Sequence, residues 1–153
     1  MASVSPLGSN PEEIWKRYKQ NSHCLKKHDF EGNTAFAAFL PEELQQEIEE
    51  IRKGRSAFKN VDRSVLFAIH TSRTAMKNAG WKKGDVLGIN IGSSRGATGL
   101  FEHFHQSFLE KKKAETLASP STTLGNISSW VAQDLESSGP EISHSVTCST
   151  ALH

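Results

Sequence analysis

The sequence has few cysteines, no long apolar run and almost no excess of either charge. Only Cys24 and Cys148 occur among its 153 residues, so they imply no framework of disulfide bridges, and we expect a reducing, cytoplasmic setting. No stretch approaches the ~18 apolar residues that span a bilayer, and the first residues lack the pattern of a secretory signal. The 18 basic and 17 acidic side chains nearly cancel, which argues against nucleic acid or a membrane surface as partner.

Apolar residues are also scarce. They make up 36% of the chain, which is low for a protein whose central strands are buried on both faces. The length is nevertheless enough for one domain with a core. We therefore expect that part of the core of this fold is formed by residues outside this chain.

The first half of the sequence predicts amphipathic helices, because apolar residues recur there at helical spacing behind good capping residues. We expect these helices near residues 11–18, 41–54 and 63–79. Residues 5–9 are predicted to form a turn, and residues 22–40 to be irregular. In that irregular segment Cys24 and His28 have the spacing of two zinc ligands on one helical face, but a structural zinc site needs four ligands. We therefore predict ordinary loop residues there and no metal.

The second half predicts alternating strands and helices, which is the pattern of an α/β layer with parallel strand pairing. Strands are expected at residues 85–91 and 141–147, helices near residues 100–111 and 124–138, and a loop at residues 114–123. Phe101, Phe104 and Phe108 lie at helical spacing, so we expect this stripe to pack inside the protein. The glycine-rich loop at residues 92–99 matches neither phosphate-binding spacing, so we expect it to serve close backbone packing.

Cys148 lies where a predicted strand gives way to small and hydroxylated residues that can begin a helix. Gly139 and Pro140 end the preceding element, and proline suits the entry of a strand rather than its centre. A thiol at the start of a helix is stabilised as a thiolate by free N–H groups and by the positive end of the helix dipole. From these residues alone, two interpretations stay open: a reactive thiol, and a small cysteine packed after a strand.

Five segments along the chain resemble, in order, the β-ketoacyl synthases, the condensing enzymes of fatty-acid and polyketide synthesis. They are an S-P-L-G turn, an A-M-K-N-A-G-W segment, a glycine-rich segment, an S-P-S-T-T loop and a G-P…V-T-C-S-T-A-L segment, at residues 5–8, 75–81, 87–100, 118–126 and 139–153. Together they cover nearly the whole chain. The family usually has Thr-Ala before its nucleophilic cysteine, whereas Val146 and Thr147 stand here, and the cysteine itself is in place.

The resemblance implies an α/β fold of the thiolase-like αβαβα layered type. This chain would supply its N-terminal half only, an incomplete sheet with flanking helices, as one domain over residues 1–153 truncated just after the nucleophile elbow. Cys148 is then the acylated nucleophile of a decarboxylative Claisen condensation between an acyl thioester and malonyl-acyl carrier protein, with no cofactor. The family's catalytic histidine pair follows the nucleophile, so His144 and His153 stand in the wrong context and receive no catalytic role.

The resemblance also implies an acyl carrier protein as partner and a homodimer of the full-length protein. Arg55 and Lys59 fall near the family's docking residues and are the expected docking site for the acidic carrier, although a solvated basic segment would look the same. A non-catalytic chain-length-factor partner subunit is the alternative function, but such partners typically lack the cysteine. A cysteine-dependent thioester hydrolase of another fold is disfavoured by the upstream segments. We expect residues 1–153 alone to be inactive and poorly folded.

Overall fold

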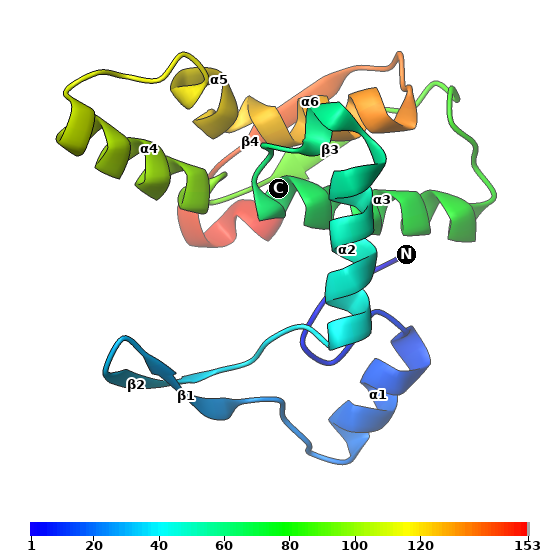
Figure 1. Cartoon of the computed structure of the whole chain (residues 1–153). Coiled ribbons are helices and arrows are strands. Elements are labelled where there is room, and N and C mark those ends of the chain that lie inside the picture. Colours follow the sequence, from blue (N-terminus) through cyan, green and yellow to red (C-terminus); the bar gives the residue numbers. More distant parts are fainter. Residues whose placement is uncertain (153) are drawn as a thin grey trace.

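The computed structural model describes residues 1–152 and combines helices with two small sheets. In chain order its elements are α1 (Pro11–Lys19), β1 (Lys26–Phe30), β2 (Asn33–Ala37), α2 (Glu42–Gly54), the 3-10 segment η1 (Ser56–Phe58), α3 (Arg63–Ala79), β3 (Ile89–Gly92), α4 (Thr98–Lys111), α5 (Ala118–Thr122), α6 (Gly125–Leu135), β4 (Glu141–His144) and the 3-10 segment η2 (Thr147–Leu152). In Figure 1, α1 and the β1–β2 hairpin lie below the rest of the molecule, and α2 connects them to a body formed by the later elements.

The core lies where α2, α3 and α6 meet β3. Apolar side chains from these four elements are buried together: Leu44, Ile48, Ile51, Val65, Leu66, Ile69, Ile89, Ile127, Val131 and Leu135. Phe58 from η1 is also fully buried and contacts the Trp130 ring edge-on, at a centroid distance of 5.7 Å. Because the buried residues of α2, α3 and α6 recur at helical spacing, the structure confirms the amphipathic pattern predicted for these helices. The predicted helix α1 also forms, but the described residues bury none of its side chains.

Local hydrogen bonds set the starts of α1 and α3. Asn10 Oδ1 accepts from two backbone N–H groups of α1 at 2.9 and 3.2 Å, and Asp62 Oδ1 accepts from the Ser64 N–H of α3 at 2.8 Å. Gly80 ends α3 with a left-handed φ of 74°, a conformation that glycine adopts without steric cost. Ser5 and Gly8 close the predicted N-terminal turn with paired backbone bonds of 3.1 and 2.8 Å. Within residues 1–152 no helix has the length and apolar character to cross a membrane.

β3 and β4 form the predicted parallel pair, with Ile89 opposite Glu141 and Gly92 opposite His144. β3 leads into the glycine-rich loop, and β4 leads into the segment that contains Cys148. The carboxyl ends of parallel strands lie at the same edge of a sheet. The sheet therefore places two loops side by side that are far apart in the sequence.

Both strands are shorter than predicted. At residues 85–88 the Ser137 hydroxyl replaces a strand ladder, because it donates to the Leu87 carbonyl at 2.6 Å and accepts from the Leu87 N–H at 3.2 Å. β4 ends at His144 because the chain turns directly after it, with the Val146 N–H donating to a side chain at 2.9 Å. Hydrophobicity alone cannot show where such side-chain bonds end a ladder.

The prediction of an irregular segment at residues 22–40 is wrong, because β1 and β2 form an antiparallel hairpin there. Glu31 and Gly32 make its turn with φ of 54° and 87°, the two-residue geometry that matches the twist of the strands. The sequence gives little sign of this hairpin. Glutamate precedes the turn glycine, where asparagine or aspartate is usual, and most side chains of the two strands are exposed, so they show no alternation of apolar and polar residues. Cys24 precedes β1 and His28 lies within it, so the two share no helical face.

The aromatic stripe of α4 is not buried by the described residues, contrary to the prediction. Phe101 is 61% exposed and Phe108 is 46% exposed, and Ser107 is the buried residue of this helix. The apolar spacing correctly predicted a helix, but no described element fully covers that face. A smaller correction concerns residues 114–123, where α5 occupies part of the predicted loop.

Candidate functional site

Cys148 lies just beyond β4, in η2, and its side chain is exposed. Thr147 before it has a φ of 49°, a left-handed conformation that is a genuine outlier for a β-branched residue and reverses the chain sharply. The structure thus has the predicted order of strand, sharp turn and cysteine, followed up to residue 152 by a 3-10 segment in place of an α-helix. We call residues 145–150 the Cys148 turn; His153 lies outside the described residues.

Thr150 holds the Cys148 turn from within. Its hydroxyl accepts from the Val146 N–H at 2.9 Å and donates to the Thr147 carbonyl at 2.6 Å. The Ser149 hydroxyl and N–H both donate to the Val146 carbonyl, at 3.0 and 3.2 Å. These bonds fix the backbone on both sides of Cys148 while leaving its thiol in solvent.

The Cys148 turn is also held against β3. His144 Nδ1 lies 3.0 Å from Asn90 Oδ1, and His144 Nε2 lies 3.0 Å from the Thr150 carbonyl oxygen. An ideal Cβ built on Gly92 would lie 2.8 Å from His144 Nε2 and from two atoms of Thr150. Only glycine leaves room for this contact, which confirms the close backbone packing predicted for the glycine-rich loop. No sequence motif signalled the roles of His144 and Asn90.

The two thiols differ in accessibility. Cys148 is exposed, whereas Cys24 is partly buried and its sulfur lies 3.6 Å from Arg17 Nη1. An exposed thiol in a constrained turn can reach the carbonyl carbon of a thioester, and thiol exchange between thioesters costs little. Cys24 is therefore a natural internal control for the reactivity of Cys148.

The basic residues at the end of α2 and just after it have different surroundings. Arg52 donates from Nη1 to the carbonyls of Lys59 and Val61 at 3.2 and 3.0 Å, so it braces the backbone. Arg55 lies 5.0 Å above the Phe58 ring and 3.9 Å from a buried carboxylate oxygen of Asp134. The Lys59 side chain is exposed, with no ion-pair partner within residues 1–152. Lys59 is thus the freer of the two expected docking residues.

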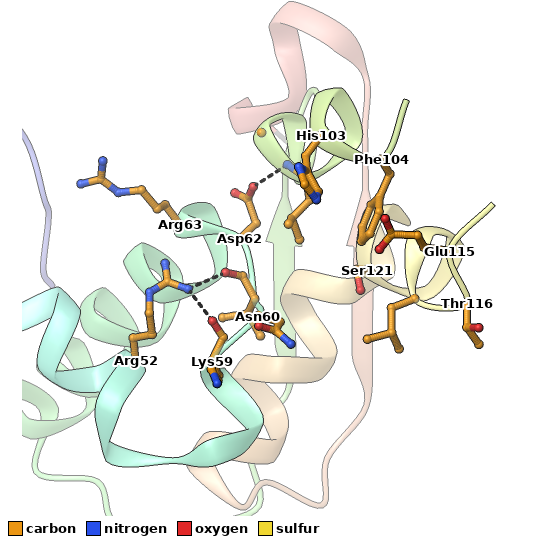
Figure 2. Close-up of a pocket in the computed structure, with 14 residues that line it drawn as sticks. Arg52, Lys59, Asn60, Asp62, Arg63, His103, Phe104, Glu115, Thr116 and Ser121 are labelled. Carbon is orange, nitrogen blue, oxygen red and sulfur yellow. Dashed lines mark hydrogen bonds between the residues drawn. The ribbon is translucent and has the colours of Figure 1, made fainter. Parts of the chain in front are cut away.

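Lys59 lies at the edge of a cavity of about 580 Å³ between the start of α3, α4 and the segment before α5 (Figure 2). Asp62 stands at one wall, where its Oδ2 accepts from the Leu100 N–H of α4 at 3.3 Å. Glu115 lies on the opposite side and accepts from the Ser107 hydroxyl at 2.6 Å, a bond that lowers the pKa of Glu115 with further help from Lys111. Cys148 does not line this cavity.

A buried carboxylate on α6 is the strongest electrostatic feature that sequence reasoning missed. Asp134 is fully buried and accepts from Arg73 Nε and Nη2 at 2.7 and 2.6 Å. Lys83 Nζ lies 3.7 Å away, in addition to Arg55. The hydrogen bond to Asp134 raises the pKa of Arg73, against the opposing effect of burial. The Arg73–Asp134 pair joins α3 to α6. We assign it a structural role, because the Asp134 carboxylate is surrounded by the cations of Arg73, Arg55 and Lys83.

Known proteins of one family match the chain. The family model of the β-ketoacyl synthase N-terminal domain matches residues 1–153. The 3-oxoacyl-[acyl-carrier-protein] synthase 2 of Vibrio cholerae is 24% identical over 159 residues, which covers 100% of this chain and 38% of the relative. The protein of the same name from Coxiella burnetii is 22% identical over 156 residues, which covers 98% of this chain and 38% of the relative.

Solved structures show the same fold. A β-ketoacyl synthase from Burkholderia phymatum superposes with a TM-score of 0.67 at 16% identity, covering 97% of this chain and 38% of that one. The ishigamide ketosynthase/chain length factor gives a TM-score of 0.68 at 16% identity, covering 94% of this chain and 38% of that one. These matches establish the thiolase-like α/β fold expected from the sequence. With the family model matching over all 153 residues, the chain belongs to the β-ketoacyl synthase family.

Proposed function

We propose that the complete protein condenses an acyl thioester with malonyl-acyl carrier protein through an acyl-Cys148 intermediate. The observation that carries this proposal is the exposed thiol in a sharp turn at the end of β4, within a chain that matches the family throughout. The relatives named above are 3-oxoacyl-[acyl-carrier-protein] synthases. Because the chain spans 38% of their length, the proposal concerns the complete protein.

The proposed reaction has two halves. In the first, the Cys148 thiolate attacks the acyl thioester carbonyl, its new C–S bond replaces the old one, and the carrier leaves as a thiolate. The backbone N–H of Cys148 is the proposed donor to the oxyanion that develops on that carbonyl. In the second, malonyl-carrier protein loses carbon dioxide, the resulting carbanion attacks the acyl carbon, and Cys148 leaves as the thiolate.

Lys59 and Arg55 are the proposed docking residues for the acidic carrier protein. Lys59 supports this role because its side chain is exposed beside the cavity of Figure 2. Arg55 should contribute less to docking, because its guanidinium already lies 3.9 Å from the Asp134 carboxylate. Exposed charge pairs contribute only about 0.2–1 kcal/mol each, so we expect docking to depend on several charges and to weaken with salt. Lys59→Glu should raise the KM for carrier protein at low salt, and Lys53→Glu is the matched control.

A homodimer is the proposed assembly of the complete protein. Among the described residues β4 pairs only with β3, and Ile142 on it is 57% exposed. An unpaired strand edge with an exposed apolar side chain favours pairing with another chain. Ile142→Lys should shift the dimer toward monomer in analytical ultracentrifugation, and an unchanged mass would remove this edge as the interface.

The acylation step can be tested directly. The complete protein is incubated with a labelled acyl thioester, and the label is mapped to peptides by mass spectrometry. We expect label on Cys148 and none on Cys24, with labelling lost in Cys148→Ala and kept in Cys24→Ala. Labelling that survives Cys148→Ala would contradict the proposal.

A non-catalytic partner subunit is the second candidate, because one similar structure contains a chain length factor. The presence of Cys148 favours the catalytic function. Malonyl-dependent product formation separates the two. Product that disappears in Cys148→Ala supports the enzyme, and its absence in a purified, folded complete protein supports the partner subunit.

A further inference from the structure

His144 occupies an unusual position for a histidine without an assigned role. It is the last residue of β4, is half-buried, and stands between β3 and the Cys148 turn. Both of its ring nitrogens have partners, with Nδ1 at 3.0 Å from Asn90 Oδ1 and Nε2 at 3.0 Å from the Thr150 carbonyl oxygen. The imidazole therefore connects the adjacent strand to the turn.

The direction of the second bond follows from its acceptor. A carbonyl oxygen only accepts, so Nε2 carries the hydrogen and donates to Thr150. In a neutral ring Nδ1 then accepts, and the Asn90 amide can present its NH₂ group there. In a charged ring Nδ1 donates, and the same amide presents its oxygen. The bond to Thr150 is the same in both cases.

Thr150 links His144 to the backbone around Cys148. Its carbonyl is held by His144, and its hydroxyl holds the Val146 N–H and the Thr147 carbonyl. One residue, buried to 5% exposure, therefore ties both flanks of Cys148. Loss of the imidazole would leave the Thr150 carbonyl without this donor in a buried position, which destabilises the local arrangement.

We propose that His144 is a positioning residue that fixes the Cys148 turn through the Nε2–H bond to Thr150. The inference rests on the proposed function, in which Cys148 is the acylated nucleophile. His144 is not the base for Cys148, because its Nε2 is committed to Thr150 and its Nδ1 to Asn90. Its effect is on geometry, and displacing a nucleophile by about 1 Å can cost roughly a hundredfold in rate.

Two substitutions separate this role from simple packing. The amide nitrogen of Gln reaches the place of Nε2, whereas that of Asn reaches only the place of Nδ1. In the complete protein we expect His144→Gln to keep the acylation kcat within about threefold of wild type and His144→Asn to lower it roughly tenfold or more, with KM unchanged. His23→Asn, at an exposed position before β1, is the matched control and should have no effect.

Thermal unfolding of the same proteins completes the test. Equal melting temperatures for the Gln and Asn variants, with only Gln active, support positioning by Nε2. Equal acylation rates for Gln and Asn overturn the inference, whether both are fast or both fall together with the melting temperature. The proposed function fails separately, when labelling survives Cys148→Ala.

Discussion

The body around α2, α3 and α6 uses apolar residues differently from α4 and from the β1–β2 hairpin, two separate elements with exposed apolar side chains. In the body, Ile48 of α2 and Leu66 and Ile69 of α3 are fully buried in one core cluster. On the hairpin Phe36 is 74% exposed, and on α4 Phe101 is 61% exposed. A large exposed apolar side chain adds little to the free energy of folding until other residues cover it and remove it from water. The described residues therefore stabilise the fold through the body, while the exposed apolar side chains of α4 and of the hairpin are available for contacts with other segments or chains.

The largest effect should come from opening the body. We expect Ile69→Ala to lower the free energy of unfolding by about 3 kcal/mol, because it leaves a cavity in a fully packed site. Phe101→Ala should change it by less than about 0.5 kcal/mol, since Phe101 is already 61% exposed. Urea unfolding of both variants tests the comparison, and similar losses would show that the α4 stripe is covered in solution.

The buried ion pair should come next. Removing one partner of a buried pair typically costs about 3–5 kcal/mol, but Arg73 is 38% exposed and can rehydrate. We therefore expect Asp134→Ala to cost about 2 kcal/mol. Glu50→Ala, which breaks a pair whose partners are both 70% exposed, should be undetectable by the same urea titration. A stable Asp134→Ala protein would mean that the pair does not help to join α3 to α6.

A smaller loss should follow from Asp62→Ala. Asp62 caps α3 through Oδ1 and contacts the start of α4 through Oδ2, and loss of such a cap costs about 1–2 kcal/mol. Asn10→Ala removes the cap of α1, an exposed helix outside the body. Its effect should be confined to α1, so that hydrogen exchange rises there and not in α3. Identical exchange patterns in the two variants would contradict this division.

The smallest effect concerns the pH dependence of Glu115. Its hydrogen bond from Ser107 lowers its pKa, so this contribution to stability is present above the ordinary glutamate pKa of about 4.3. It is lost as the pH falls through the lowered value. NMR titration should show Ser107→Ala raising the pKa of Glu115 toward its ordinary range. An unchanged titration would mean that the bond is not formed in solution.

Local patterns predicted most of the body. Leu44, Ile48 and Ile51 repeat at helical spacing and are buried on one face of α2, and α3 ends at Ala79, as predicted. The hairpin was missed because Glu31 with Gly32 is a rare turn pair and its strands bury little. In the site, the order of strand, turn and Cys148 was predictable, while the reactivity of Cys148 and the docking roles of Arg55 and Lys59 stay predictions.

The sequence by itself determined the longer helices α1, α2, α3, α4 and α6 and that a cysteine follows the last strand, because capping residues and apolar spacing act over a few neighbouring residues. The tertiary structure alone decided which apolar faces are covered and how the Cys148 turn is held. His144 and Asn90 are 54 positions apart, and Arg73 and Asp134 are 61 apart. Bonds over such separations depend on how β3, β4, α3 and α6 pack, and no local pattern of residues encodes that packing.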